Sequence, residues 1–281
     1  MRKVHFLFLL LFSVHLFAQV DKKKEIATQM LNACEKIQGA KYDVITTERK
    51  KNGSITVKKL QVKLKTHPKQ IYIYCIQPDS SAEVLWKPAE MKNEALVNPN
   101  GFPYINLKLD LYSSTLRKDD HHTIKELGFD YIYSMVTHIK NKLGDKFYSY
   151  LSIADTIQKD GRKLARIVFD YTDFAYIPYI IKKGENATTI AIMNDINEYM
   201  IVCANKNVKD FHDVKEGQQI VIPNCFGRKI IFGIDVETKL PLLQEVYDEK
   251  GLFERYELNN FILNPKFAED EFTPDFKDYH F

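Results

Sequence analysis

The sequence contains only four cysteines among its 281 residues. The spacing of Cys34, Cys75, Cys203 and Cys225 resembles no metal knuckle, so the cysteines predict no zinc site. In an oxidising compartment they would allow three complete pairings, and Cys203 with Cys225 is the pair to test first. Small buried thiols that pack as apolar side chains are an equally good interpretation.

An excess of charge of one sign is also lacking. Removing Arg2 and Lys3 with a predicted leader leaves 38 basic residues (40 − 2) against 37 acidic ones, a net charge near +1 (38 − 37). This balance provides no electrostatic footprint for nucleic acid, so no such partner is expected. The rest of the chain has no basic amphipathic helix for a membrane face, so we expect no stable membrane insertion either.

The signature motifs of common enzymes are missing: no nucleophile elbow, HExxH zinc motif, P-loop or dinucleotide fingerprint is present. The densest polar cluster runs from Asp119 to His122, and metal sites do use these residue types. Adjacent histidines point to different sides of a strand or helix, however, and Asp119, Asp120 and Thr123 can cap a helix instead. We therefore expect no catalytic residue, no metal and no cofactor. The alternative is a peptidoglycan-modifying or other envelope enzyme that uses the Asp119–His122 cluster.

One long hydrophobic run is present, at the start of the chain. Arg2 and Lys3 precede an apolar stretch from Phe6 to Phe17, and Ala18 is a small residue at a suitable cleavage point. About a dozen apolar residues are too few to span a membrane but typical of a secretory signal peptide. The sequence predicts a signal peptide over residues 1–18 and a periplasmic protein.

After the leader, the hydrophobic pattern changes from helical to extended. Residues 22–36 keep a helical period, and from Lys41 apolar residues alternate with polar ones. Asn52-Gly53 accepts the positive φ of a hairpin turn, and short strands divided by prolines follow as far as Leu109. Apolar residues then return to a helical period from Thr123 to Leu143, with a break or kink near Gly128. Further strands before and after residues 179–224 predict an α+β fold with an antiparallel sheet covered by helices.

Residues 179–224 form a unit of their own in this pattern. Tyr179 to Ile181 predicts a strand, two short helical segments follow, and Gln219 to Ile222 predicts a second strand. The chain therefore divides into a signal peptide (1–18), the first part of a main domain (19–178), an insert (179–224) and the closing strands with a C-terminal tail (225–281). Exposed loops tolerate such insertions well.

The insert resembles the lysin motif (LysM), a βααβ module that binds peptidoglycan and other N-acetylglucosamine glycans. The residues that carry the resemblance are Tyr179, Gly184-Glu185-Asn186, Ile190-Ala191, Asn205, Asp213, Gly217-Gln218 and Ile222-Pro223. The resemblance implies a glycan groove between two loops, lined by Gly184, Glu185, Asn186 and Ala187 on one side and by Lys206, Asn207 and Val208 on the other. A structural or protein-docking insert is the alternative.

The main domain is similar to the family of the periplasmic outer-membrane lipoprotein carrier (LolA-like), and most of all to secreted proteins of unknown function with this fold and a LysM insert. The segments that carry the similarity are Glu83–Trp86, Leu96–Leu109, Arg117–Asp130 and the closing pattern from Ile234-Asp235 to Asn264-Pro265. The similarity implies a curved half-barrel sheet that wraps helices around a cavity for an acyl lipid or lipoprotein.

The aromatic residues that could line such a cavity are Tyr72, Tyr74, Trp86, Tyr104, Phe129 and Tyr131. They could equally fill a closed core, because a sheet-and-helix domain needs large apolar side chains. From these features we expect a non-enzymatic periplasmic scaffold that binds lipid or lipoprotein and associates with peptidoglycan.

Overall fold

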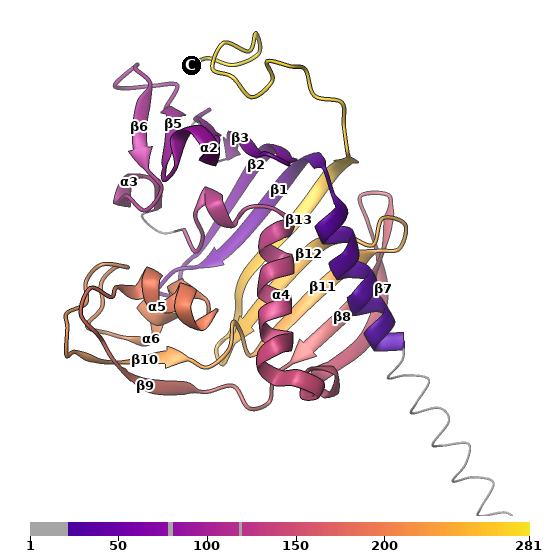
Figure 1. Cartoon of the computed structure of the whole chain (residues 1–281), viewed down its shortest axis with the longest axis vertical. Helices are drawn as coiled ribbons and strands as arrows, with labels where there is room; N and C mark the ends of the chain where they lie inside the picture. Colours follow the sequence, from indigo (N-terminus) through magenta and orange to yellow (C-terminus); the bar gives the residue numbers. More distant parts are fainter. Residues whose placement is uncertain (1–21, 78–80, 118–119) are drawn as a thin grey trace, which may run out of the picture.

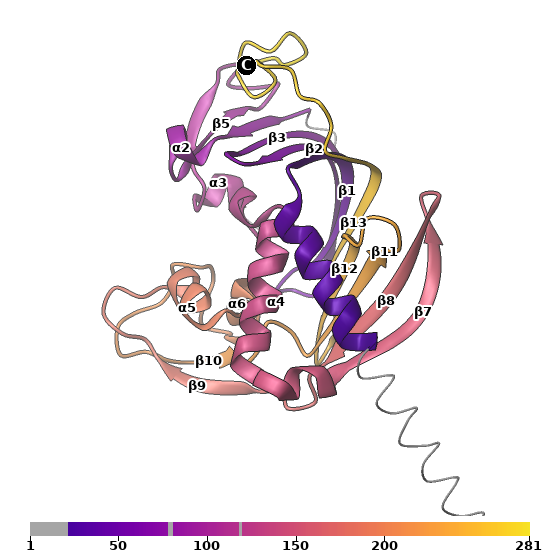
Figure 2. The same ribbon diagram turned by 45° about the vertical axis from the view of Figure 1, so that its right-hand side comes forward.

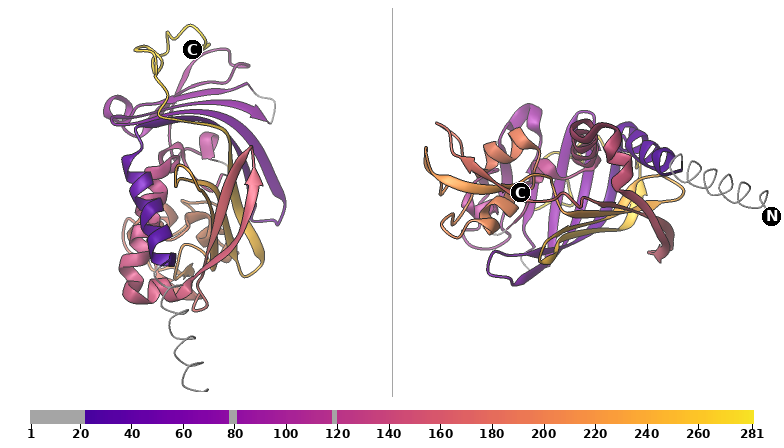
Figure 3. Two further views of the ribbon diagram at one scale, coloured as in Figure 1. Left: turned by 90° about the vertical axis from the view of Figure 1, so that its right-hand side faces the viewer. Right: turned by 90° about the horizontal axis from the view of Figure 1, so that it is seen from below.

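The structure is a computed structural model that describes residues 22–77, 81–117 and 120–281, so the predicted signal peptide lies outside the described residues. Within these ranges the chain forms an 11-stranded antiparallel sheet and a separate 2-stranded sheet (Figure 1). The large sheet curves around the helices that lie on one of its faces (Figure 3). The predicted α+β class with a large antiparallel sheet is therefore confirmed.

Two meanders meet in the middle of the large sheet. The strand order is β6-β5-β4-β3-β2-β1-β13-β12-β11-β8-β7, so the first and last strands of the sequence are neighbours. Their register runs from Ala40 opposite Leu263 to Glu48 opposite Glu254. The strands are β1 Gly39–Arg49, β2 Ile55–Thr66, β3 Lys69–Gln77, β4 Glu83–Trp86, β5 Glu94–Asn98, β6 Leu107–Asp110, β7 Leu151–Lys159, β8 Arg162–Asp170, β11 Lys229–Asp235, β12 Pro241–Asp248 and β13 Gly251–Leu263.

The β1–β2 hairpin turns where the sequence predicts it. Gly53 has a φ of +87°, a conformation that glycine adopts without strain, and its amide donates to the Lys50 carbonyl at 2.8 Å. β1 then pairs with β2 without a register shift over its whole length. The local turn chemistry thus sets the register of the strands that enclose the core.

Two helices cover the concave face of the sheet. The helix over residues 22–36 buries Ala27 and Met30, and α4 (Phe129–Leu143) buries Met135 and Ile139 against the same core (Figure 2). Short helices complete the set: α2 Pro88–Met91, α3 Ser114–Arg117, η1 Ile124–Glu126 and η2 Gly144–Tyr150. In the described part of the chain, none of the helices combines the length and apolarity needed to cross a membrane.

The predicted helix from Thr123 to Leu143 is divided in two. Thr123 caps η1 in a reciprocal capping box with Glu126, and this short helix ends at Glu126 with Leu127 as its C-cap. Gly128 follows with a φ of +120°, and α4 begins only at Phe129. The left-handed backbone at Gly128 is the physical reason for the break, which the sequence places near this residue.

Residues 176–223 form β9 (Tyr176–Ile180), α5 (Ala187–Asn194), α6 (Glu198–Ala204) and β10 (Gln219–Pro223). β9 and β10 pair with each other and not with the large sheet. The first strand thus begins three residues before the predicted Tyr179. The segment emerges beside α4 at one end of the molecule (Figure 1).

The C-terminal tail, residues 264–281, covers part of the opposite face of the sheet. Tyr72 stacks on Tyr279 with ring centroids 3.7 Å apart, and Leu85 is buried with Phe272 in the same small cluster. Because neighbouring strand residues point to opposite faces, Ile71 enters the main core while Tyr72 enters this second cluster. The tail therefore gives β3 and β4 apolar cover on both faces.

Replacing Leu85 by alanine tests this second cluster. Leu85 is fully buried, so Leu85→Ala should lower the free energy of unfolding by about 2–5 kcal/mol. Leu263→Ala is the matched control, because Leu263 is 38% exposed and should cost about 0.5 kcal/mol or less. Urea unfolding followed by circular dichroism measures both values. Equal effects of the two substitutions would show that the tail does not bury β4.

Candidate functional site

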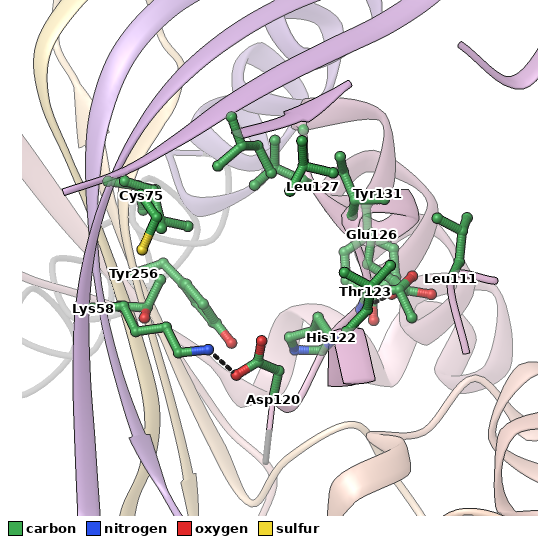
Figure 4. A pocket seen from close by; sticks show the side chains of 18 of the residues that line it. Lys58, Cys75, Leu111, Asp120, His122, Thr123, Glu126, Leu127, Tyr131 and Tyr256 are labelled. Carbon is green, nitrogen blue, oxygen red and sulfur yellow. Dashed lines mark hydrogen bonds and ion pairs between the residues drawn. The ribbon is translucent and has the colours of Figure 1, made fainter. Parts of the chain in front are cut away.

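A cavity of about 510 Å³ lies between the sheet and the segment that leads into α4 (Figure 4). Strands β1 to β6 together with β12 and β13 supply one wall, and residues 111–117 and 120–132 supply the other. Most of the lining is apolar: Val44, Leu60, Ile73, Val84, Val97, Leu109, Leu111, Leu116, Ile124, Leu127, Ile132 and Leu258. The volume lies within the usual range of pockets that enclose a small molecule, about 300–1,000 Å³.

The period of the strands explains why this wall is apolar. Tyr42, Val44 and Thr46 are alternate residues of β1, so their side chains share one face of the sheet. Leu60 of β2 lies opposite Val44 in the register, and both line the cavity. The cavity is therefore built from one face of a regular sheet.

One end of the cavity is polar. The Lys58 ammonium forms an ion pair with Asp120 across it, and both side chains are partly exposed (Figure 4). Tyr256 donates from its hydroxyl to Glu48 at 2.5 Å, and the Thr123 hydroxyl donates to Glu126 at 2.5 Å. A ligand in this cavity would meet charged and hydroxyl groups at one end and hydrocarbon over the rest.

Directly behind this polar end, Glu254 of β13 is fully buried. His121 Nδ1 lies 2.7 Å from Glu254 Oε2, and His122 Nε2 lies 3.2 Å from both carboxylate oxygens. The side-chain amide of Asn197 donates to the same carboxylate at 3.0 Å. One buried carboxylate thus holds His122 of the cavity wall, its neighbour His121 and Asn197, the N-cap residue of α6.

This geometry fixes the charges of His122 and Glu254. Burial alone would lower the pKa of His122, but the charge and hydrogen bonds of Glu254 outweigh burial and raise this pKa to about 9. Burial alone would raise the pKa of Glu254, but the two histidines hold it well below the ordinary value of 4.5. At neutral pH the two groups therefore form a buried ion pair.

Further contacts attach residues 176–223 to the same place. Arg117 is almost fully buried and donates to both carboxylate oxygens of Glu198, at 2.9 and 2.7 Å. The Arg117 guanidinium also lies 3.7 Å from the centre of the Phe211 ring. The His121 ring stacks on Tyr199 at 4.4 Å between ring centroids. Cavity wall and insert are therefore packed as one body.

The Asp119–His122 cluster, considered above for catalysis, is found in contacts that support the fold. Asp119 lies outside the described residues. His121 is fully buried, and both of its ring nitrogens face oxygen acceptors, Glu254 and the Arg49 carbonyl. Over the described ranges, no group of three or more histidine, cysteine, aspartate or glutamate side chains has the arrangement of a metal site. The neighbouring Asp120 and His122 line the cavity.

The six aromatic residues expected at a cavity separate into two groups. Phe129 and Tyr131 line it. The other four do not: Trp86 belongs to the main core, Tyr72 and Tyr74 pack under the tail, and Tyr104 is 80% exposed. These four side chains therefore lie outside this cavity, and for Tyr72 and Tyr74 the sequence alone does not show which face of the strand looks inward.

The seven residues implied for a glycan groove lie at the start of α5 with the loop before it, and in the loop after α6. Asn186 caps α5 by accepting from Thr189, Glu185 accepts from Tyr179, and Ala187 and Val208 are buried. Gly184, Lys206 and Asn207 are exposed. Lys51 of the β1–β2 turn donates to the carbonyls of Asn205 at 2.8 Å and Lys206 at 3.4 Å.

Sequence reasoning missed Glu48, Lys58 and Glu254, which supply the polar end and its support. Glu48 continues the series of alternate β1 residues whose side chains face the cavity. This alternation was the one sequence feature that could have identified it.

Cys203 and Cys225 are free thiols, so the disulfide between them that was to be tested first does not form, and burial raises the pKa of both thiols. Cys34 is likewise a free, buried thiol. The interpretation as packed thiols fits these three residues.

Comparison with known families gives one match. The family model described as "Protein of unknown function (DUF1571)" matches residues 38–175, which run from the start of β1 to the loop before β9. None of the curated proteins matches the chain.

Several solved structures are similar at low identity. A chain of the Pseudomonas aeruginosa MucA/MucB complex is 12% identical with a TM-score of 0.43, and the match covers 89% of this chain and 60% of that one. The Mycobacterium tuberculosis lipoprotein LppX is 12% identical with a TM-score of 0.42, covering 88% and 98% of the two chains. A LolA superfamily protein from Nitrosomonas europaea is 9% identical with a TM-score of 0.34, covering 89% and 96%.

The buried ion pair predicts a loss of stability at alkaline pH. Because the folded protein raises the pKa of His122 from 6.5 to about 9, its contribution is complete below pH 6.5 and disappears as the pH rises through about 9. The free energy of unfolding should fall across this window by an amount on the order of 3 kcal/mol. Urea unfolding at a series of pH values measures the slope.

The variant His122→Gln tests whether His122 causes this change in the free energy of unfolding with pH, because glutamine cannot take up a proton in this range. The variant should show a flatter profile between about pH 6.5 and about pH 9. His67→Gln is the control, since His67 is exposed and far from Glu254 in the sheet. A His122→Gln profile as steep as that of the unaltered protein would contradict the assignment.

Proposed function

We propose that the chain is a non-enzymatic binding protein of the bacterial periplasm that holds the acyl chain of a lipid or lipoprotein. The observation that carries this proposal is the apolar cavity of about 510 Å³ between the sheet and the start of α4. Each methylene group moved from water into such a lining gains about 0.8 kcal/mol, so an acyl chain fits the chemistry of the wall. The resemblance to the lipoprotein-carrier family implies the same class of ligand.

The polar end of the cavity supports an amphipathic ligand. Lys58, Asp120 and Tyr256 are positioned to contact a head group while hydrocarbon fills the rest of the space. A few polar groups at one end of an apolar pocket typically fix the orientation of a ligand. We propose that the head group lies at this end.

The buried histidines support a binding role without catalysis. His121 is fully buried and surrounded by Tyr199, Phe253 and Glu254, so a substrate does not reach its ring. His122 is held by the carboxylate of Glu254. These contacts stabilise the cavity wall, and they explain the histidines without a reaction.

We further propose that residues 179–224 associate the protein with peptidoglycan as a LysM-like module. The order β9, α5, α6, β10 with a separate two-stranded sheet supports this proposal. Lys206 and Asn207 are exposed, and the Lys51 ammonium lies at the neighbouring carbonyls. A glycan in this groove would contact the exposed loop beside a positive charge. Export would follow from the signal peptide predicted over residues 1–18.

Filling the cavity tests acyl binding. Val84 lines the cavity, and Val84→Trp would occupy space that the acyl chain needs. Native mass spectrometry of the purified protein should show a bound acyl species in the unaltered chain, and a fluorescent fatty acid should bind at least about tenfold more weakly to the variant. Val57→Trp is the matched control, because Val57 is 46% exposed on β2. Equal fatty-acid affinity of all three proteins would contradict the proposal.

A peptidoglycan pull-down tests the insert. Asn207→Trp should obstruct the groove and reduce retention on purified peptidoglycan sacculi, whereas Glu216→Trp, at an exposed position elsewhere in the insert, should not. Both proteins should unfold at the same temperature, since both positions are exposed. The proposal is wrong if the unaltered protein stays in the supernatant, or if both variants are retained as well as it is.

A further inference from the structure

The two most exposed large apolar side chains of the described residues, Phe102 and Tyr104, lie on one loop together with a third, Ile105. Phe102 is 87% exposed, Tyr104 is 80% exposed and Ile105 is 59% exposed. The rings of Phe102 and Tyr104 lie 6.5 Å apart at an angle of 89°. Single exposed apolar residues are normal on protein surfaces, but a cluster of this kind marks an interaction site.

A defined turn holds the cluster away from the core. The Tyr104 amide donates to the Gly101 carbonyl at 2.5 Å, and the Asn100 amide donates to the Asn98 side chain at 2.8 Å. Asn98 is itself buried and donates to the carbonyl of His280 in the tail. The base of the loop is therefore anchored, and its aromatic tip points into solvent.

This loop connects β5 to β6, the edge strand of the large sheet, at the rim of the cavity. Pro99 before the tip and Leu107 after it both line the cavity wall. Figures 1 and 2 show β5 and β6 at the end of the molecule opposite β9 and β10. The apolar surface thus continues from the cavity to the exposed tip.

We propose that residues 102–105 insert into the interfacial layer of a lipid bilayer and place the cavity rim against the membrane that exchanges acyl chains with the cavity. This inference rests on the proposed function. Phenylalanine and tyrosine are suited to the boundary between head groups and acyl chains, because their rings bury in hydrocarbon while the tyrosine hydroxyl stays hydrated.

The size of the cluster favours a bilayer over a protein partner. A stable protein interface buries about 800 Å² on each side, which three side chains at a turn do not provide. Shallow insertion of a few apolar side chains needs no complementary surface and gives weak, reversible membrane contact. Such contact suits a protein that must leave the membrane with its ligand.

Flotation with vesicles of phosphatidylethanolamine and phosphatidylglycerol tests the proposal. The unaltered protein should float with the vesicles, and the combined variant Phe102→Ser/Tyr104→Ser/Ile105→Ser should bind at least about tenfold more weakly. Ile192→Ser/Met193→Ser is the matched control. These two residues are 59% and 58% exposed on α5, away from the cavity, and their replacement should leave vesicle binding unchanged.

The outcomes distinguish this inference from acyl binding by the cavity. The loop variant should keep the fatty-acid affinity and melting temperature of the unaltered protein. If the combined variant is unstable, flotation of the single variant Phe102→Ser tests the same contact. Val84→Trp should still bind vesicles. The proposal is overturned if the unaltered protein stays below the vesicles, or if the loop and control variants lose binding equally. Loss of fatty-acid binding with retained flotation would remove the cavity function and leave the loop contact.

Discussion

The buried carboxylate of Glu254 is the group around which the cavity end of this fold is assembled. It lies on β13 and binds His121, His122 and Asn197, which belong to two different parts of the chain. A buried charge is stable only when it is paired and hydrogen-bonded, so these partners are required once Glu254 is in place. The cavity wall and the insert are consequently held to the same point of the sheet.

This arrangement also explains how an open space persists beside a well-packed core. The apolar wall is one face of strands β1 to β6 with β12 and β13. On the other side of the cavity, hydrogen bonds of His121 and Thr123 hold the segment of residues 120–127 in place. Lys58 and Asp120 join the two sides at the polar end. Polar contacts at the edge therefore keep the two apolar walls apart, which is the condition for a ligand to occupy the space between them.

Much of the fold follows from short-range patterns in the sequence. The Asn52-Gly53 turn, the alternation along β1 and β2 and the helical period over residues 22–36 each predict the element that forms. The candidate site is less predictable, because its contacts join distant segments such as His121 and Glu254. The inward direction of Tyr131 and the outward direction of Tyr104 likewise depend on tertiary packing, to which local periodicity gives no access.

The pairing of β1 with β13 determines when the large sheet can be completed during folding. Ala40 lies opposite Leu263, so the two halves of the sheet join only when the last strand is present. Contacts between such distant residues carry a large loop-closure cost and form late in folding. A chain still being synthesised lacks the partner of its first strand and has no complete sheet. The cavity wall is likewise incomplete until then, because Tyr256 and Leu258 of β13 line it together with residues of β1.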